Sequence, residues 1–207
     1  MSKVDRLVDG ELRSQGIRDE AVLSAIRRVP RHLFVPDSMQ PWAYDDRALP
    51  IGHGQTISQP FIVALMSELL GVGAGSRVLE VGTGSGYQAA VLAELGAEVY
   101  TIEIVPELAE EARQRLEGLG FTTVHFCTGD GYHGWAEHAP YDGVIVTCAP
   151  EDIPAPLVHQ LKEGGKIVVP VGPQMASQSL WKGEKRGGKL TMERVLDVVF
   201  VPMTGPR

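Results

Sequence analysis

Cysteine is scarce in this chain, and long apolar runs are missing. The 207 residues contain only Cys127 and Cys148, too few for a disulfide framework. No apolar run approaches the roughly 18 residues that a membrane-spanning helix needs, and residues 1–10 lack the apolar core of a signal peptide. The sequence therefore predicts a reduced, cytoplasmic protein that does not enter a membrane.

Positive charge is also in short supply. The chain has 19 lysines and arginines against 26 aspartates and glutamates, which gives a formal net charge of −7. This balance argues against broad capture of nucleic acid, whose phosphates attract basic surfaces. The six histidines do not occur at the spacing of metal ligands. We therefore expect neither a nucleic-acid partner nor a bound metal.

Glycine and proline, in contrast, exceed average usage, with 24 and 14 residues respectively. Much of the excess lies in residues 50–60, 82–86, 129–134 and 150–156. The chain has no internal repeat and no low-complexity tract, so these residues predict loops rather than linkers. Residues 31–58, which hold several of them, are expected to be one long irregular stretch of the kind that is often functional.

The rest of the chain alternates between patterns typical of strands and helices. Apolar runs predict strands at residues 77–81, 98–102, 124–127, 141–147 and 166–171. Helical spacing predicts helices at residues 19–29, 61–70, 87–95, 106–116 and 156–161. A final strand pair is expected at 180–181 and 190–203, with a charged loop at 182–189 between them. This order predicts a doubly wound α/β fold, in which a mostly parallel sheet carries helices on both faces.

A glycine loop between the first strand and its helix is the strongest single motif. Gly82, Gly84 and Gly86 follow Glu80 at the end of the strand, so the spacing is G-x-G-x-G. Glycines allow a ligand close to the backbone, and the helix N-terminus that follows attracts negative charge. A dinucleotide-binding fold requires its third glycine at the position where this chain has the bulky Tyr87. The motif is instead similar to that of class I S-adenosylmethionine-dependent methyltransferases.

Two acidic residues at the ends of the next strands support a nucleoside site. Glu103 ends the second strand, where a carboxylate can accept both hydroxyls of a ribose. Asp130 and Gly131 follow the third strand, where a carboxylate can accept the amino group of adenine. The carboxyl ends of parallel strands share one edge of the sheet, so these residues should lie close together. A plain surface turn remains the alternative for each of them.

The segment at residues 49–60 carries a more specific resemblance. Its Gly-x-Gly-Gln-Thr-Ile-Ser-Gln-Pro element resembles protein-L-isoaspartate O-methyltransferases, and general methyltransferases lack that element. Matching motifs occur along nearly the whole chain, at residues 31–36, 44–46, 81–88, 129–131, 141–142, 149–150, 161–165 and 200–204. The resemblance implies a single domain over 1–207, with N-terminal helices and the active-site loop in 1–70 and a Rossmann-like core in 71–207. It also implies a seven-stranded sheet and a monomer.

The resemblance implies an activity and a set of site residues. Such enzymes use S-adenosylmethionine to esterify the carboxylate of L-isoaspartyl residues in damaged proteins and peptides, which begins their repair. Carried onto this chain, it assigns cofactor contacts to Gln55, Thr56, Ile57, Ser58, Glu80, Gly82, Thr83, Gly84, Ser85, Gly86, Glu103, Ile104, Asp130, Gly131 and Thr204. It assigns substrate contacts to Thr56, Ser58, Cys148 and Ala149, and the catalytic role to Ser58.

Ser58 has two interpretations in the sequence. It precedes Pro60 and a predicted helix, a context typical of an N-terminal cap. Its hydroxyl could equally hold one oxygen of an acceptor carboxylate while the other oxygen attacks. Some relatives carry histidines after this element, but this chain has Phe61, Ile62 and Val63, so no histidine role is transferred.

Two other functions stay open at this point. One is a methyltransferase for nucleic acid or a small molecule, although the Asn-Pro-Pro-Tyr type of motif is absent after the fourth strand. The other is a cofactor-binding protein that no longer catalyses and serves as a partner module. Retention of Ser58, the glycine loop and Glu103 together argues against it.

Overall fold

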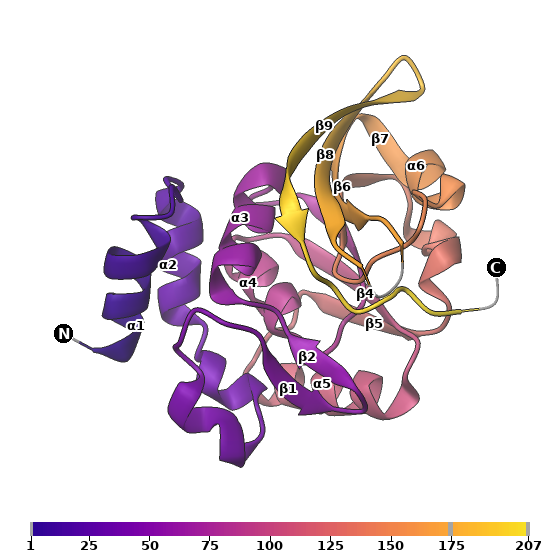
Figure 1. Cartoon of the computed structure of the whole chain (residues 1–207). Coiled ribbons are helices and arrows are strands. Elements are labelled where there is room, and N and C mark those ends of the chain that lie inside the picture. Colours follow the sequence, from indigo (N-terminus) through magenta and orange to yellow (C-terminus); the bar gives the residue numbers. More distant parts are fainter. Residues whose placement is uncertain (1, 174–175, 206–207) are drawn as a thin grey trace.

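A seven-stranded sheet forms the centre of the molecule. The computed structural model describes residues 2–173 and 176–205 (Figure 1). Within them the strand order is β5-β4-β3-β6-β7-β8-β9. The pairs from β5 to β7 are parallel, and β7–β8 and β8–β9 are antiparallel. The strands are β3 (Arg77–Val81), β4 (Glu98–Glu103), β5 (Val124–Thr128), β6 (Tyr141–Val146), β7 (Leu161–Val171), β8 (Gln178–Arg186) and β9 (Lys189–Val198). This confirms the predicted α/β sheet with its antiparallel C-terminal pair.

Helices cover both faces of this sheet. They are α1 (Lys3–Asp5), continued by a π-helical segment Arg6–Leu12, α2 (Glu20–Arg28), α3 (Pro60–Leu70), α4 (Tyr87–Glu94), α5 (Pro106–Gly118) and α6 (Ala155–Gln160). Four short 3₁₀ segments occur among the described residues, at Arg31–Phe34, Asp37–Trp42, Gly131–His133 and Ala136–His138. Each of the five predicted helices is present, with bounds close to those expected.

Strand alternation divides the core into two halves. In β3, Val78 packs with α3 and α4 on one face, whereas Leu79 packs with Leu157 of α6 on the other. Both side chains are fully buried. This arrangement follows from the period of two along a strand, which sends successive apolar residues to opposite faces. Because both faces are covered, the glycine loop after β3 emerges at the edge of the sheet rather than on a face.

The stretch at residues 31–58 is more regular than its sequence indicates. It contains a two-stranded antiparallel hairpin, β1 (Leu49–Gly52) and β2 (Gln55–Ile57), which is separate from the main sheet. The turn places Gly52, His53 and Gly54 at positive φ, a backbone conformation that glycine adopts easily. Leu49, Ile51 and Ile57 are buried. Three- and four-residue strands are too short for alternation to reveal them in the sequence.

The predicted charged loop at 182–189 is wrong. Residues up to Arg186 belong to β8, and β9 begins at Lys189. Only Gly187 and Gly188 form the turn, both at positive φ, which suits the two-residue turns that join antiparallel strands. The charged side chains belong to strands exposed on one side and pair with neighbours, as Lys182 does with Glu193 at 3.0 Å. β9 ends at Val198, earlier than the predicted strand end at 203.

Candidate active site

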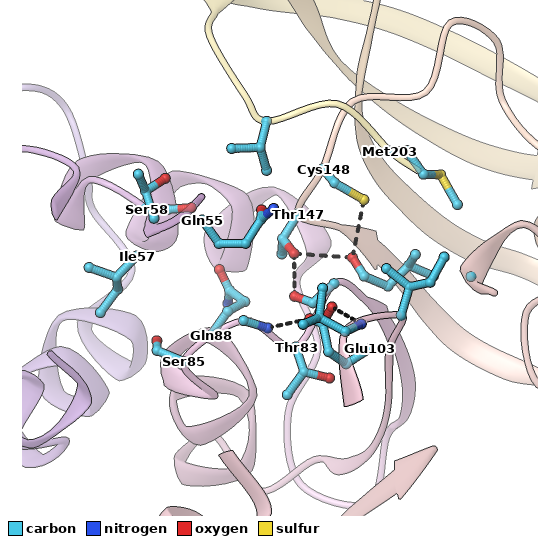
Figure 2. Close-up of a pocket in the computed structure, with 18 of the residues that line it drawn as sticks. Gln55, Ile57, Ser58, Thr83, Ser85, Gln88, Glu103, Thr147, Cys148 and Met203 are labelled. Atoms are coloured by element: carbon cyan, nitrogen blue, oxygen red, sulfur yellow. Dashed lines mark hydrogen bonds between the residues drawn. The ribbon is translucent and has the colours of Figure 1, made fainter. Parts of the chain in front are cut away.

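A cavity opens at the carboxyl edge of the sheet, where β3, β4 and β6 end (Figure 2). Its volume is about 810 Å³, including the part that opens to solvent. Figure 2 shows Gln55 and Ser58 on one side of it, with Thr147, Cys148 and Met203 on the other. Pockets of this size accommodate small-molecule ligands. The position is the one that open α/β sheets use for ligand binding.

The glycine loop forms the floor of this cavity. Gly82, Gly84 and Gly86 have φ values of +97°, +53° and +85°. A Cβ on Gly82 would lie 2.5 Å from Oγ1 of Thr147, so no larger residue fits without displacement of the neighbouring strand end. Gly86 is the N-terminal cap residue of α4. The loop therefore presents backbone to the cavity, as the glycine spacing predicts.

Glu103 connects the glycine loop with the start of α5. Its Oε2 accepts a hydrogen bond from the Gly84 backbone N–H at 2.8 Å, and its Oε1 accepts one from the Val105 N–H at 3.0 Å. The residue is almost fully buried and lines the cavity. Two backbone donors thus hold the carboxylate at the end of β4, and each oxygen keeps a further lone pair that can accept a ligand hydroxyl.

Glu80 lies behind the glycine loop instead of in the cavity. Its side chain is fully buried, its Oε2 accepts a hydrogen bond from Oγ1 of Thr101 at 2.6 Å, and its Oε1 makes no hydrogen bond within the described residues. The Thr101 hydroxyl is in turn 2.6 Å from that of Thr83, which lines the cavity. Burial raises the pKa of Glu80 to about 8, and the negative charge of Glu103 adds to the effect. Glu80 therefore braces the loop as a neutral acid at pH 7.

This raised pKa predicts a stability difference that depends on pH. The native state keeps the Glu80 proton up to about pH 8, whereas the unfolded chain releases it near the ordinary glutamate pKa of 4.5. A rise in pH from 4.5 to 8 therefore favours unfolding. Glutamine carries no titratable proton, so we expect Glu80→Gln to become more stable relative to the parent as the pH rises from 4.5 to 8. At about 1.4 kcal/mol per pH unit, this relative gain in the free energy of unfolding reaches roughly 3 kcal/mol at pH 7. Urea unfolding at pH 4.5, 6, 7 and 8 measures the difference. A difference independent of pH would contradict the assignment, and Glu107→Gln, which alters an exposed carboxylate, is the control.

Ser58 is not the cap of α3. The cap residue is Gln59, whose side chain makes no capping hydrogen bond. Asp46 supplies the missing acceptor, because its Oδ1 accepts the Phe61 backbone N–H at 2.8 Å and its Oδ2 accepts Nε2 of Gln59 at 3.0 Å. Within residues 2–173 and 176–205 the Ser58 hydroxyl has no hydrogen-bond partner. The hydroxyl is thus available to a molecule in the cavity that Ser58 lines.

Asp130 and Gly131 lie where β5 leads into the next 3₁₀ segment. Oδ1 of Asp130 accepts the Tyr132 backbone N–H at 2.9 Å, and the buried Oδ2 makes no hydrogen bond in the described chain. Gly131 lines the cavity, and a Cβ there would lie 2.3 Å from Cγ1 of Val81. Asp130 does not line the cavity itself, and Gly205 of the tail packs beside its carboxylate.

Most of the residues that the sequence assigns to the site line one cavity. Those that do are Gln55, Thr56, Ile57, Ser58, Gly82, Thr83, Gly84, Ser85, Glu103, Ile104, Gly131, Cys148 and Thr204. Glu80, Gly86, Asp130 and Ala149 do not. Ala149 uses both of its backbone groups to hold the tail, since its N–H donates to Val201 and its carbonyl accepts from Met203.

Sequence reasoning missed another group of lining residues. They are Val63, Val81, Tyr87, Gln88, Ile102, Val105, Thr147, Val201, Pro202 and Met203. Gln88 and Tyr87 follow the glycine loop directly, and their place in the first turn of its helix was the signal that could have found them. Cys148 is a poor nucleophile here, because burial raises the pKa of its thiol to about 12, helped by the negative charge of Glu103.

Neither a metal cluster nor a membrane-spanning helix occurs in the residues that the structure describes. No cluster of three or more His, Cys, Asp or Glu side chains in that part of the chain could hold a metal ion. No helix in residues 2–173 and 176–205 combines the length and the apolar character needed to cross a membrane.

Comparison with known proteins identifies the family of this arrangement. The chain matches the family model of protein-L-isoaspartate(D-aspartate) O-methyltransferases over residues 2–207. A protein-L-isoaspartate O-methyltransferase of Gloeobacter violaceus is 54% identical over 198 residues, 96% of this chain and 97% of the relative.

Solved structures agree with this match. A protein-L-isoaspartate O-methyltransferase structure has a TM-score of 0.91 at 32% sequence identity, and the match covers 98% of this chain. This chain spans 66% of that structure's chain, just under two thirds of its length. A Plasmodium falciparum structure assigned to the same enzyme, in complex with S-adenosyl-L-homocysteine, has a TM-score of 0.85 at 26% identity and covers 99% of both chains. The chain belongs to the protein-L-isoaspartate(D-aspartate) O-methyltransferase family.

Proposed function

We propose that this chain transfers the methyl group of S-adenosylmethionine to the free carboxylate of L-isoaspartyl residues in damaged proteins and peptides, and so initiates their repair. Family membership supports the reaction class. The observation that carries the proposal to this chain is the unpartnered hydroxyl of Ser58, which lines the same cavity as Glu103 and the glycine loop.

The residues of the cavity fit S-adenosylmethionine. Gly82 and Gly84 leave room for close approach to the backbone beside the methionine portion, and Glu103 has lone pairs for the ribose hydroxyls. Asp130 lies next to Gly131 outside the cavity lining, and its buried Oδ2, which makes no hydrogen bond in the described residues, is the acceptor that we propose for the adenine amino group. The Thr204 segment closes the site from the C-terminal tail. When bound, this cofactor supplies a methyl group attached to a positively charged sulfur.

The acceptor needs little activation by the protein. A carboxylate with an ordinary pKa near ~4 is ionised at neutral pH, so no general base is required. The remaining tasks are alignment of the reacting groups and exclusion of water. Ser58 can donate a hydrogen bond to one carboxylate oxygen and leave the other free to attack. Thr56 offers a second hydroxyl from the same loop.

A second groove supports a path for the acceptor chain. It shares Thr56 and Ser58 with the cavity and continues past Phe61 and Ile62 of α3 toward Val199. Val199 is 84% exposed and adds an apolar side chain to the lining of this groove. An extended peptide laid in this groove would bring its carboxylate to Ser58, while its flanking residues contact apolar side chains.

Wider properties form part of the same proposal. Two free thiols, Cys127 and Cys148, support a cytoplasmic location. The family match over residues 2–207 supports a single domain over 1–207, and a monomer belongs to the same proposal. The net charge of −7 supports the absence of a nucleic-acid partner.

Aged protein offers a test of this function. A deamidation-prone protein incubated at mildly alkaline pH accumulates isoaspartyl residues, so it should accept base-labile methyl groups in proportion to its incubation time. The same protein taken fresh is the control. Methylation of nucleic acid under these conditions, or equal labelling of fresh and aged protein, would contradict the proposal.

A further inference from the structure

Arg31 is an almost fully buried cation. It is only 1% exposed, and no carboxylate of the described chain forms an ion pair with it. Burial lowers the pKa of its guanidinium, and the Tyr87 hydroxyl and the negative charge of Asp46 only partly oppose this effect. Among residues 2–173 and 176–205 its Nη1 makes no hydrogen bond of ordinary geometry, although the Tyr87 hydroxyl is close enough to stabilise the cation. Buried charges in this situation destabilise a fold, so stability alone does not explain Arg31.

The hydrogen bonds of Arg31 join three backbone carbonyls, those of Ala43, Arg47 and Ser58, of which Ser58 lines the cavity. Its Nε donates to the Ala43 carbonyl at 2.9 Å, and its Nη2 donates to the Ser58 carbonyl at 2.7 Å. The Ser58 bond crosses 27 positions of the sequence. The planar guanidinium suits this double contact, since its donors point in fixed directions. Arg31 thus connects the backbone of Ser58 with that of Ala43, which directly follows the 3₁₀ segment Asp37–Trp42.

The guanidinium also contacts a residue that lines the cavity. Its central carbon lies 4.8 Å from the ring centroid of Tyr87, a distance typical of a cation–π contact. Tyr87 is the first residue of α4, directly after Gly86, and it lines the cavity. One side chain therefore contacts both the Ser58 backbone and the residue that follows the glycine loop.

We propose that Arg31 is a positioning residue that fixes Ser58 relative to the glycine loop, so that the Ser58 hydroxyl meets the acceptor carboxylate in line with the methyl donor. This inference rests on the proposed function of Ser58. An apolar side chain of similar length would fill the same volume without a buried charge, but it could not hold the Ser58 carbonyl. The hydroxyl would then sample orientations in which the acceptor is misaligned.

A double-mutant cycle tests this coupling. Arg31→Met and Arg31→Lys are made in the parent chain and in Ser58→Ala, and kcat is measured with an isoaspartyl peptide. In the parent we expect kcat to fall at least tenfold for Arg31→Met, with a smaller loss for Arg31→Lys. In the Ser58→Ala background the same changes should cost less than twofold further, because the residue through which Arg31 acts has lost its hydroxyl.

Two further readouts separate positioning from general destabilisation. The affinity for S-adenosyl-L-homocysteine, measured by calorimetry, should change less than twofold in a folded Arg31 variant. Arg28→Met, which removes a largely exposed arginine, should leave kcat unchanged. Arg31→Lys keeps the charge and the stem, so it provides a folded variant if Arg31→Met does not fold.

The possible outcomes are distinct. Equal fold losses in both backgrounds, or an unchanged kcat in folded Arg31→Lys and Arg31→Met, would overturn the role of Arg31. A parent chain that binds S-adenosyl-L-homocysteine but esterifies no isoaspartyl peptide would instead overturn the proposed function.

Discussion

Ser58→Ala is expected to lower kcat by about 10- to 100-fold while the affinity for S-adenosyl-L-homocysteine changes less than twofold. The hydroxyl is the group that we assign to the acceptor carboxylate, and loss of a positioned donor at a reacting group has effects of this size. The cofactor contacts assigned to Glu103 and the glycine loop stay intact in this variant. Steady-state kinetics with an isoaspartyl peptide and calorimetry with S-adenosyl-L-homocysteine measure the two quantities separately.

The stability of the same variant distinguishes the two roles that the sequence left open. A lost N-terminal cap costs about 1 kcal/mol, which would lower the melting temperature by several degrees. Since Asp46 and not Ser58 accepts the first free N–H of α3, Ser58→Ala should melt within a degree of the parent. Ser38→Ala, at an exposed serine, is the matched control. An unchanged kcat together with a lowered melting temperature would return Ser58 to a structural role.

Glu103→Ala is expected to weaken S-adenosyl-L-homocysteine binding by about 10- to 100-fold. The substitution removes the carboxylate assigned to the ribose and also frees the Gly84 and Val105 backbone donors. Hydrogen bonds to a charged group contribute about 1.5–3 kcal/mol each, and about 1.4 kcal/mol corresponds to a tenfold change in affinity. Fluorescence or calorimetric titration gives the dissociation constant.

Two further variants test whether the carboxylate at position 103 itself is responsible for this affinity. Glu103→Asp keeps a carboxylate at the end of β4, so most of the affinity should return. Glu107→Ala, at an exposed position of α5, should bind as the parent does. Equal affinity in Glu103→Ala and the parent would show that the carboxylate does not contact the ribose.

Local patterns predicted most of the fold and the floor of the site. The strand at 77–81, the G-x-G-x-G loop and Glu103 lie within 27 positions of one another, and each element is defined by its own neighbours. Parallel strands then bring their carboxyl ends together, so Gly82 and Glu103 line one cavity as expected. The motif at 49–60 added the Ser58 loop, because the resemblance supplied a position that spacing alone does not.

Contacts between distant segments could not be predicted in this way. The cap of α3 comes from Asp46, which lies 15 positions before Phe61, so the local serine seemed the better candidate. Glu80 belongs to the motif by position, yet strand alternation turns its side chain into the core beside Thr101. In residues 182–189 the many charged side chains favoured the prediction of a loop. The adjacent glycines, Gly187 and Gly188, instead indicate the two-residue turn of a hairpin.

The most direct test of the proposed function uses two synthetic peptides of identical sequence, one with an L-isoaspartyl residue and one with the normal L-aspartyl residue. Both are incubated with the protein and S-adenosylmethionine, and base-labile methyl ester is measured. We predict ester on the isoaspartyl peptide and none on its aspartyl counterpart. Equal labelling of the two peptides, or no labelling of either by a chain that binds S-adenosyl-L-homocysteine, would contradict the account.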